Sequence, residues 1–208
     1  MTTLKIYKTH PDVQLPSFAT EQSACFDISF QSAGKQGYEG FNVFNKKILR
    51  PFKDGNIYIN ARDRVMVPTG IILDIPEGYS VRLHPRSGLS LKSGIVLANA
   101  EGVIDSDYVE ELMVLIWNIS DNAIQINSGD RIAQAELIKD ADYSITMIAT
   151  RPLPKTSRQG GMGSTGVTDN GDSITLNITE PKLPDFVKKP EPPVKRGRGR
   201  PRKDAVRS

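Results

Sequence analysis

An all-β fold is predicted by short β-branched runs that recur along this 208-residue chain. Clusters of Gly, Pro, Asn and Asp separate the runs and favour turns between strands. Sequence patterns typical of helices are scarce. A succession of short strands and turns is typical of a sandwich, a barrel or a jelly roll. The expected strands cover residues 56–60, 64–68, 70–75, 79–83, 111–118, 123–126 and 132–139.

Two segments interrupt this pattern. Residues 31–50 mix Gly with polar side chains, which predicts a long loop or a hairpin insertion. Residues 90–99 follow a break at 85–88 (Pro-Arg-Ser-Gly) and are expected to begin as a turn or a short helix. Residues 1–150 are long enough to form one domain with its own core.

The C-terminal third of the chain divides into three further parts. Residues 151–166 end in a Gly-rich run, which predicts an arm rather than core structure. Residues 167–187 form an extension whose alternating Ile174, Leu176 and Ile178 predict an edge strand or a docking segment. Residues 188–208 are rich in Pro, Gly and basic side chains, a composition that predicts disorder.

Charge is distributed unevenly between the body and this tail. Residues 188–208 hold nine basic and two acidic side chains, a net charge of +7, so the overall +3 leaves −4 for residues 1–187. The run Arg198-Gly199-Arg200-Pro201 is similar to an AT-hook core, which enters the narrow minor groove of A·T-rich DNA. The alternative is a solvated basic tail with nonspecific affinity for nucleic acid. Either interpretation makes residues 195–203 a candidate DNA contact.

The single cysteine, Cys25, cannot form an intramolecular disulfide, which favours a reducing compartment. The N-terminal MTTLKIYKTH lacks the apolar region of a secretory signal. No segment reaches the roughly 18 apolar residues that a membrane span needs. A cytoplasmic protein without a membrane partner is therefore expected.

Two motifs in the body could bind phosphate or activate water. In PRSGLSLKSG (85–94), the backbone after Arg86 and Ser87 can face an anion, although a purely structural turn is the commoner use of such a segment. In GVIDSDYVEE (102–111), Asp105 could act as a general base toward water. The alternative is that Asp105 and Asp107 only form a turn.

A third motif, RQGGMGSTG (158–166), combines glycines with Ser164 and Thr165. Its backbone could approach a triphosphate closely, and its hydroxyls could donate to it. The motif lacks the Lys and the strand–helix context of a P-loop, so a P-loop ATPase is excluded. A flexible linker is the alternative.

The order of these motifs resembles that of the trimeric dUTPase family. SACFDISF (23–30), PRSGLSLKSG, NAEGVIDSDY (99–108), GDRIAQ (129–134) and RQGGMGSTG resemble its five motifs in sequence order. The resemblance covers about residues 1–166. It implies a distorted jelly-roll or β-barrel fold and a homotrimer with a flexible C-terminal arm. It also implies Mg²⁺-dependent hydrolysis of dUTP to dUMP and pyrophosphate, which limits uracil in DNA and supplies dUMP for dTMP synthesis.

Roles for individual residues follow from the same resemblance. Asp105 would deprotonate the water that attacks the α-phosphorus, and Asp27 would contact Mg²⁺ through its water ligands. Arg86 would brace the site against Asp107. The implied substrate contacts are Asn99, Gly102, Val103 and Ile104 to uracil, Tyr108 to deoxyribose, Ser87, Gly88 and Gln134 to the α- and β-phosphates, and Arg158, Gly163, Ser164 and Thr165 of a neighbouring subunit's arm to the γ-phosphate.

The chain also departs from the family pattern. Cys25 replaces the usual glycine of the first motif, and Glu110 replaces another in the third. Met162 stands where an aromatic residue usually covers the uracil. Two alternative functions are a dCTP deaminase of the same fold and a dUTPase-like regulatory or DNA-binding protein with weak activity.

Overall fold

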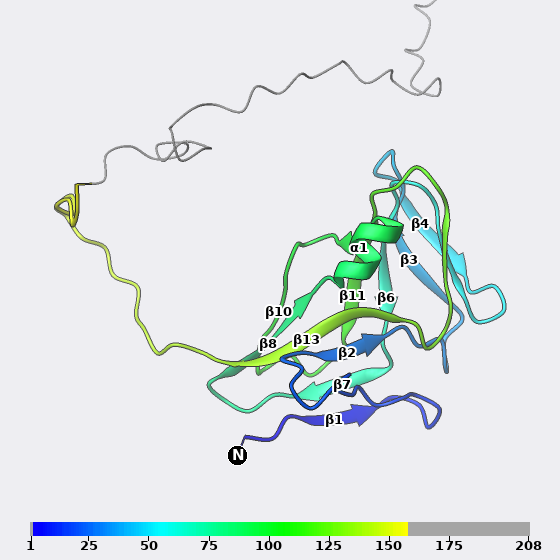
Figure 1. Ribbon diagram of the computed structural model, residues 1–208, viewed down its shortest axis with the longest axis horizontal. Coiled ribbons are helices and arrows are strands. Elements are labelled where there is room, and N and C mark those ends of the chain that lie inside the picture. The colour runs from blue at the N-terminus through cyan, green and yellow to red at the C-terminus, as the bar shows by residue number, and fades with distance from the viewer. Residues whose placement is uncertain (1, 158–208) are drawn as a thin grey trace, which may run out of the picture. The chain divides into compact units, whose positions relative to one another are not determined.

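The computed structural model describes residues 2–157 of the chain. Two compact units are present, Met1–Thr146 and Met147–Ser208, and most of the second lies outside the described residues. The first unit is built from antiparallel strands and one short helix, α1 (Ser87–Ser93), as Figure 1 shows. Along the described residues no helix is long and apolar enough to cross a membrane.

The strands of the first unit form two larger sheets and two strand pairs, and their spatial order differs from their order in sequence. The all-β prediction is confirmed. A four-stranded sheet has the order β10 (Gly102–Ile104), β8 (Tyr79–His84), β13 (Arg131–Lys139) and β2 (Phe26–Ser29). A five-stranded sheet has the order β4 (Lys47–Pro51), β3 (Gly37–Phe41), β6 (Arg64–Pro68), β11 (Met113–Asn118) and β9 (Ile95–Leu97). The pairs are β1 (Lys5–Lys8) with β7 (Ile71–Asp74) and β12 (Ile124–Ile126) with β5 (Ile57–Ile59).

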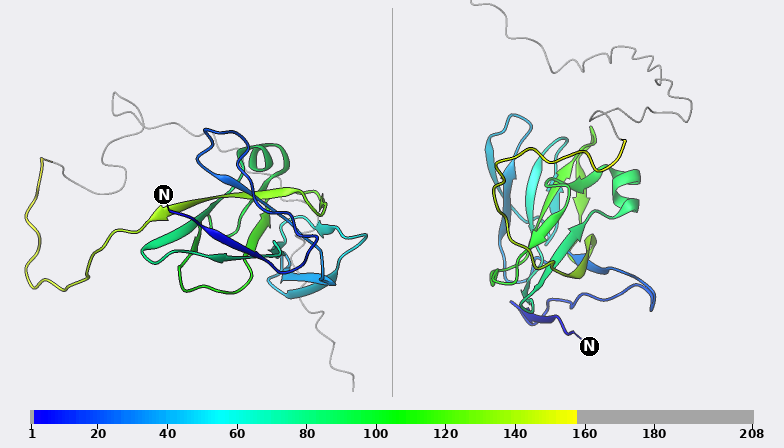
Figure 2. Two further views of the ribbon diagram at one scale, coloured as in Figure 1. Left: turned by 90° about the horizontal axis from the view of Figure 1, so that it is seen from below. Right: turned by 90° about the vertical axis from the view of Figure 1, so that its left-hand side faces the viewer.

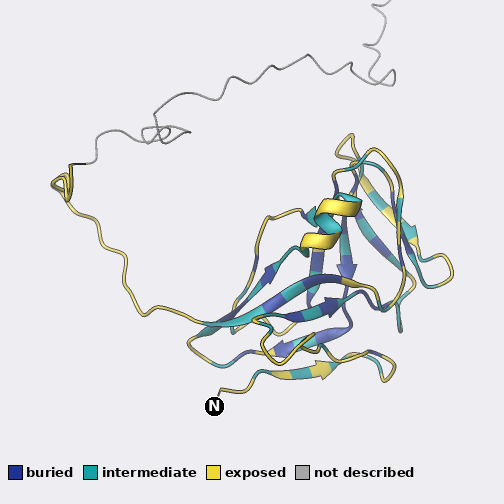
Figure 3. Ribbon diagram, viewed as in Figure 1, coloured by how far each residue is buried: buried dark blue, intermediate teal, exposed yellow. Residues whose placement is uncertain are grey.

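One hydrophobic core joins the two larger sheets. Buried and less buried residues alternate along β11 and β2, as expected for strands with one face toward a core. Val114 and Ile116 of β11 belong to the same buried cluster as Ile28 of β2 and Val81 of β8. Figure 3 shows buried segments concentrated in the strands, while α1 is largely exposed. The packed sheets therefore hold the helix and the loops that carry several of the predicted site residues.

Residues 31–50, for which a loop or a hairpin was expected, contain the β3–β4 hairpin. β3 also pairs with β6, so the hairpin extends the five-stranded sheet. Arg50 of β4 places Nη1 2.8 Å from Oδ2 of Asp63, whose side chain is almost fully buried. Because an unpaired buried carboxylate is costly, this ion pair holds the hairpin to the loop before β6.

Helix α1 (Ser87–Ser93) begins directly after the Pro85-Arg86 step that follows β8. Arg86 is its N-cap, with an extended backbone, and Gly94 ends it in the left-handed conformation with φ of 65°. Gly94 suits this position because a side chain there would be strained. Figure 2 shows α1 at the periphery of the strands, on the opposite side from β1. The helix thereby presents Ser87 and Gly88 at the surface.

Candidate active site

The residues predicted to contact phosphate lie together in one pocket. Arg86, Ser87, Gly88 and Gln134 line a cavity of about 640 Å³ with Asp27, although these residues come from three distant parts of the chain. Strand β13 brings them together because it pairs with β8 on one side and β2 on the other. Gln134 is the register partner of both His84 and Asp27. We call this cavity the phosphate pocket.

Ion pairs brace the phosphate pocket. Arg86 Nε lies 3.0 Å from Asp27 Oδ1, and Arg131 Nη1 lies 2.9 Å from Asp27 Oδ2. Arg86 Nη1 also donates to the carbonyl oxygen of Arg131 at 3.1 Å. Within one chain the carboxylate that braces Arg86 is thus Asp27, and a contact of Arg86 with Asp107 stays a prediction. Strand pairing places the carboxylate of β2, rather than that of the 105–108 turn, beside the helix N-cap.

Further polar groups complete the phosphate pocket. Gln134 Nε2 donates to the carbonyl oxygen of Pro85 at 3.0 Å, which fixes the backbone just before α1. Lys92 and Arg131 also line the cavity and were not among the predicted site residues. Arg131 lies inside the GDRIAQ segment, so that motif carried the signal. Lys92 lies on the last turn of α1 and inside the PRSGLSLKSG segment, although no role was predicted for it.

The residues predicted to contact the nucleoside line a different cavity, of about 260 Å³. Its lining includes Asn99, the whole of β10, Asp105 and Tyr108, together with apolar residues of β8, β9 and β11. Strand β10 is an edge strand that pairs only with β8 in the described part of the chain. We call this cavity the nucleoside pocket.

Asp105 begins a turn immediately after β10. The backbone N–H of Tyr108 donates to the carbonyl oxygen of Asp105 at 3.2 Å, and Tyr108 Oη donates to the carbonyl oxygen of Glu111 at 3.0 Å. The turn interpretation of this segment therefore holds for the backbone. The Asp105 residue is exposed, so its carboxylate remains available to solvent or substrate.

Within residues 2–157 the two pockets share no lining residue. Asp105, the predicted base, does not line the phosphate pocket of its own chain. The predicted arm residues Arg158, Met162, Gly163, Ser164 and Thr165 lie outside the described residues, as do the extension and the basic tail.

Cys25 lines the phosphate pocket at the position where a glycine was expected. Burial, followed by the negative charges of Glu136 and Asp27, raises the pKa of the Cys25 thiol above its usual value. The neutral thiol is therefore favoured over the thiolate near neutral pH.

Comparison with known proteins places the chain in a family. The dUTPase family model matches residues 53–166. The deoxyuridine 5'-triphosphate nucleotidohydrolase of Hydrogenobaculum sp. is 36% identical over 165 residues, which covers 79% of this chain and 98% of that protein. This chain belongs to the dUTPase family. The corresponding enzyme of Helicobacter pylori strain Shi470 is 33% identical over 79% of this chain and 97% of its own length.

Solved dUTPase structures share the fold of this family member. A dUTPase of Staphylococcus bacteriophage 80alpha, determined with dUpNHpp, superposes with a TM-score of 0.63 and 20% identity, covering 80% of this chain and all of that chain. The dUTPase of Streptococcus mutans gives a TM-score of 0.54 and 22% identity over 69% of this chain and 99% of that chain. The β architecture described above is thus that of known dUTPases.

Proposed function

We propose that this chain is a dUTP diphosphatase that hydrolyses dUTP to dUMP and pyrophosphate. The observation that carries the proposal is the division of the predicted residues by chemistry. Those expected to contact phosphate line one pocket, and those expected to contact the nucleoside line another. The names of relatives that match nearly end to end support the same activity. Such an enzyme limits uracil in DNA and supplies dUMP for dTMP synthesis.

Asp105 is the proposed general base. Its exposed carboxylate takes a proton from water as the water oxygen bonds to the α-phosphorus and the bond to the pyrophosphate oxygen breaks. Ser87 and the backbone of Gly88 hold the phosphates, since the first N–H groups of a helix have no intrahelical partner. Gln134 is held by its hydrogen bond to Pro85, and Arg86 is held by its ion pair with Asp27. Both side chains help to orient the groups that donate to the phosphates.

The nucleoside pocket offers a means of reading the base. The outer edge of β10 carries backbone N–H and C=O groups that no strand pairs with in the described part of the chain. Gly102, Val103 and Ile104 with Asn99 would bond the uracil edge. Tyr108 would pack against the deoxyribose, where its ring leaves no room for a 2′-hydroxyl. A base with the wrong donors would leave buried polar groups unpaired and bind poorly.

Mg²⁺ fits the phosphate pocket through water rather than by direct contact. Asp27 is the one carboxylate among the residues that line this pocket, and both of its oxygens are paired with guanidinium groups. Mg²⁺ retains several waters and takes oxygen ligands from substrate phosphates, so an outer contact from Asp27 suits it. When bound, the ion would neutralise charge on the triphosphate.

A homotrimer with shared sites is the proposed assembly. A complete site needs Asp105 and the phosphate pocket together, yet one chain places them in separate cavities. Val103, Leu115 and Trp117 are also 48%, 40% and 38% exposed, and neighbouring exposed apolar side chains often mark a surface that contacts a partner. The arm residues Arg158, Met162, Gly163, Ser164 and Thr165 would close the site from a neighbouring subunit.

The activity is tested by incubating the full chain with dUTP or dCTP and Mg²⁺. Pyrophosphate released from dUTP, and lost in Asp105→Asn, supports the proposal. Ammonia released from dCTP would identify the deaminase instead. Absence of turnover combined with DNA binding would identify a regulatory protein.

The shared site is tested by co-expressing two inactive variants. Asp105→Asn removes the base, and Ser87→Asp places a carboxylate in the phosphate pocket. If sites form between subunits, mixed trimers contain some sites in which Ser87 and Asp105 are both intact, so turnover returns. If each chain forms its own site, every site carries one defect and the mixture stays inactive.

DNA contact by residues 195–203 is a separate proposal that rests on the Arg-Gly-Arg-Pro sequence. A chain ending at residue 187 should lose binding to an A·T-rich duplex and retain dUTP turnover. A chain ending at residue 157 should lose turnover as well, because the arm is then missing. Equal binding to A·T-rich and G·C-rich duplexes would favour a nonspecific basic tail over an AT-hook.

A further inference from the structure

Four polar residues form a row across one face of the four-stranded sheet: Glu101, His84, Glu136 and Cys25. Gly102 is paired with Leu83, so the preceding Glu101 stands beside His84. His84 is paired with Gln134, and Glu136 lies two residues farther along β13 on the same face. Gln134 is also paired with Asp27, so Cys25, two residues before Asp27, lies opposite Glu136. Each of the four strands or its immediate flank thus contributes one member.

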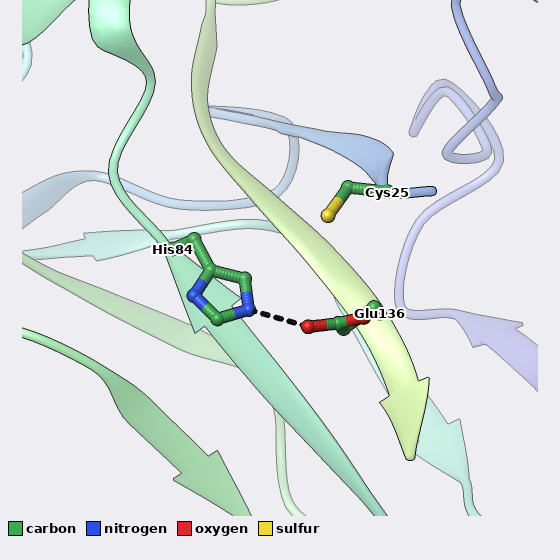
Figure 4. A group of neighbouring side chains, drawn as sticks. All are labelled: Cys25, His84 and Glu136. Atoms are coloured by element: carbon green, nitrogen blue, oxygen red, sulfur yellow. Dashed lines mark hydrogen bonds and ion pairs between the residues drawn. The ribbon is translucent and has the colours of Figure 1, made fainter. Parts of the chain in front are cut away.

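The side chains of Cys25, His84 and Glu136 converge. One ligand atom from each lies within 4.8 Å of the others, and all three residues are partly buried (Figure 4). His84 Nε2 lies 3.0 Å from Glu136 Oε1. On the far side of the ring, His84 Nδ1 lies 3.7 Å from Glu101 Oε1. The imidazole is therefore placed between two carboxylates, with the thiol beside one of them.

We propose that Cys25, His84 and Glu136 bind one zinc ion. Sulfur, imidazole nitrogen and carboxylate oxygen are the three ligand types that Zn²⁺ accepts, and a water would take the fourth position. Zinc–ligand bonds are about 2.0–2.3 Å long, so ligand atoms that already lie within 4.8 Å of one another are near the spacing that one ion requires. Mg²⁺ prefers oxygen ligands and does not suit a thiol and an imidazole.

Glu101 would act as the outer partner of this site. In the absence of metal, His84 Nε2 and Glu136 Oε1 share a hydrogen bond. Zinc would bind the Nε2 lone pair of the tautomer that carries its proton on Nδ1, so that Nδ1–H faces the Glu101 carboxylate. A carboxylate behind a metal-bound histidine orients the ring and makes it a stronger ligand. Glu101 is thus a positioning residue rather than a ligand.

The ion would fasten three strands that carry the phosphate pocket. Cys25 is two residues from Asp27, Glu136 is two residues from Gln134, and His84 precedes the Pro85-Arg86 step before α1. Because zinc would bind the folded chain and not the unfolded chain, it would raise the melting temperature. The expected role is structural, and it does not depend on the proposed dUTP hydrolysis.

Cobalt substitution tests the site because the chain holds one cysteine and two histidines. The full chain, stripped with EDTA and kept reduced, is titrated with Co²⁺. We expect the near-ultraviolet thiolate-to-cobalt charge-transfer band to saturate at one equivalent per chain and to disappear on addition of Zn²⁺. Cys25→Ser should abolish the band. Glu101→Gln should weaken binding by about 10–100-fold, as for other outer-sphere partners, and His84→Gln or Glu136→Gln by at least as much.

His10→Gln is the matched control, because it removes the other imidazole and should leave the titration unchanged. Melting temperatures measured in EDTA show which variants fold. If a variant does not fold, the test uses the unmodified chain loaded with zinc. Its X-ray absorption should show one sulfur and two or three nitrogen or oxygen neighbours around the ion. Absence of the cobalt band, a zinc shell without sulfur, or unchanged affinity in folded His84→Gln and Glu136→Gln would overturn the proposal.

Discussion

The phosphate pocket and the nucleoside pocket are built in opposite ways. The phosphate pocket draws on three distant segments, and its central carboxylate, Asp27, is 14% exposed and paired with two arginines. The nucleoside pocket takes its predicted substrate contacts from one segment, residues 99–108, in which Asp105 is exposed and the hydroxyl of Tyr108 donates to the nearby carbonyl of Glu111. Substitutions in the first region should therefore alter both stability and activity. Substitutions in the second should alter activity alone.

The largest expected effect is that of Asp105→Asn. Loss of a general base lowers turnover by about 10²–10⁴-fold. The melting temperature should stay unchanged, because no hydrogen bond to the Asp105 side chain is found among the described residues and the carboxylate faces solvent. Steady-state kinetics and thermal unfolding of the same preparation check this. A large fall in melting temperature would show that the nucleoside pocket is also a structural centre.

Asp27→Asn should lower stability as well as turnover, in contrast to Asp105→Asn. It removes the negative partner of Arg86 and Arg131. A hydrogen bond to a charged group contributes about 1.5–3 kcal/mol to stability. Partial exposure of both arginines reduces this, so we expect a loss of about 1–3 kcal/mol in the free energy of unfolding, measured with urea. Turnover should also fall as Arg86 loses its orientation.

The matched control is Asp107→Asn, the carboxylate that the sequence had suggested as the partner of Arg86. Asp107 is exposed, so its replacement should change stability by less than about 0.5 kcal/mol. Equal losses in the two variants would mean that the Asp27 ion pairs contribute nothing specific.

The pairing of Arg86 with Asp27 shows which part of the site local sequence does not predict. The β-branched run at 64–68 coincides with β6, and Asp105 and Tyr108 fall in the same pocket as expected. Strands such as β1 and β2 were missed because KIYK and FDIS show little local pattern and gain their stability from distant partners. The partner of Arg86 depends on the register between β2, β13 and β8. Register over such separations is set by packing of the whole sheet, which local sequence does not record.

Tyr108→Ala tests how the nucleoside pocket distinguishes deoxyribose from ribose. Removing the ring opens the space where a 2′-hydroxyl would lie, so preference for dUTP over UTP should fall about tenfold or more, measured as the ratio of kcat/KM values. Tyr108→Phe keeps the ring and loses only the exposed bond to the carbonyl of Glu111. It should retain the preference. A loss of preference in Tyr108→Phe would assign the discrimination to the hydroxyl instead.

Gly88→Ala should have a small effect on stability, and in an unusual direction. A Cβ built on Gly88 meets no atom within 4 Å, and the residue lies in α1. Alanine is favoured over glycine in a helix by about 0.8–1 kcal/mol, so the free energy of unfolding should rise by up to that amount. The same methyl group occupies the phosphate pocket, which Gly88 lines, and should raise KM for dUTP.

Gly94→Ala is the matched control at the other end of the helix. Its φ is 65°, and an added Cβ would lie 3.1 Å from Cβ of Ser120, so this substitution should destabilise the chain by about 1 kcal/mol. Opposite signs for the two glycines would show that Gly88 is retained for access of phosphate rather than for folding. If Gly88→Ala left KM unchanged, the phosphates would have to bind away from the start of α1. Only Asp27 and its two arginines would then link stability to activity in the phosphate pocket.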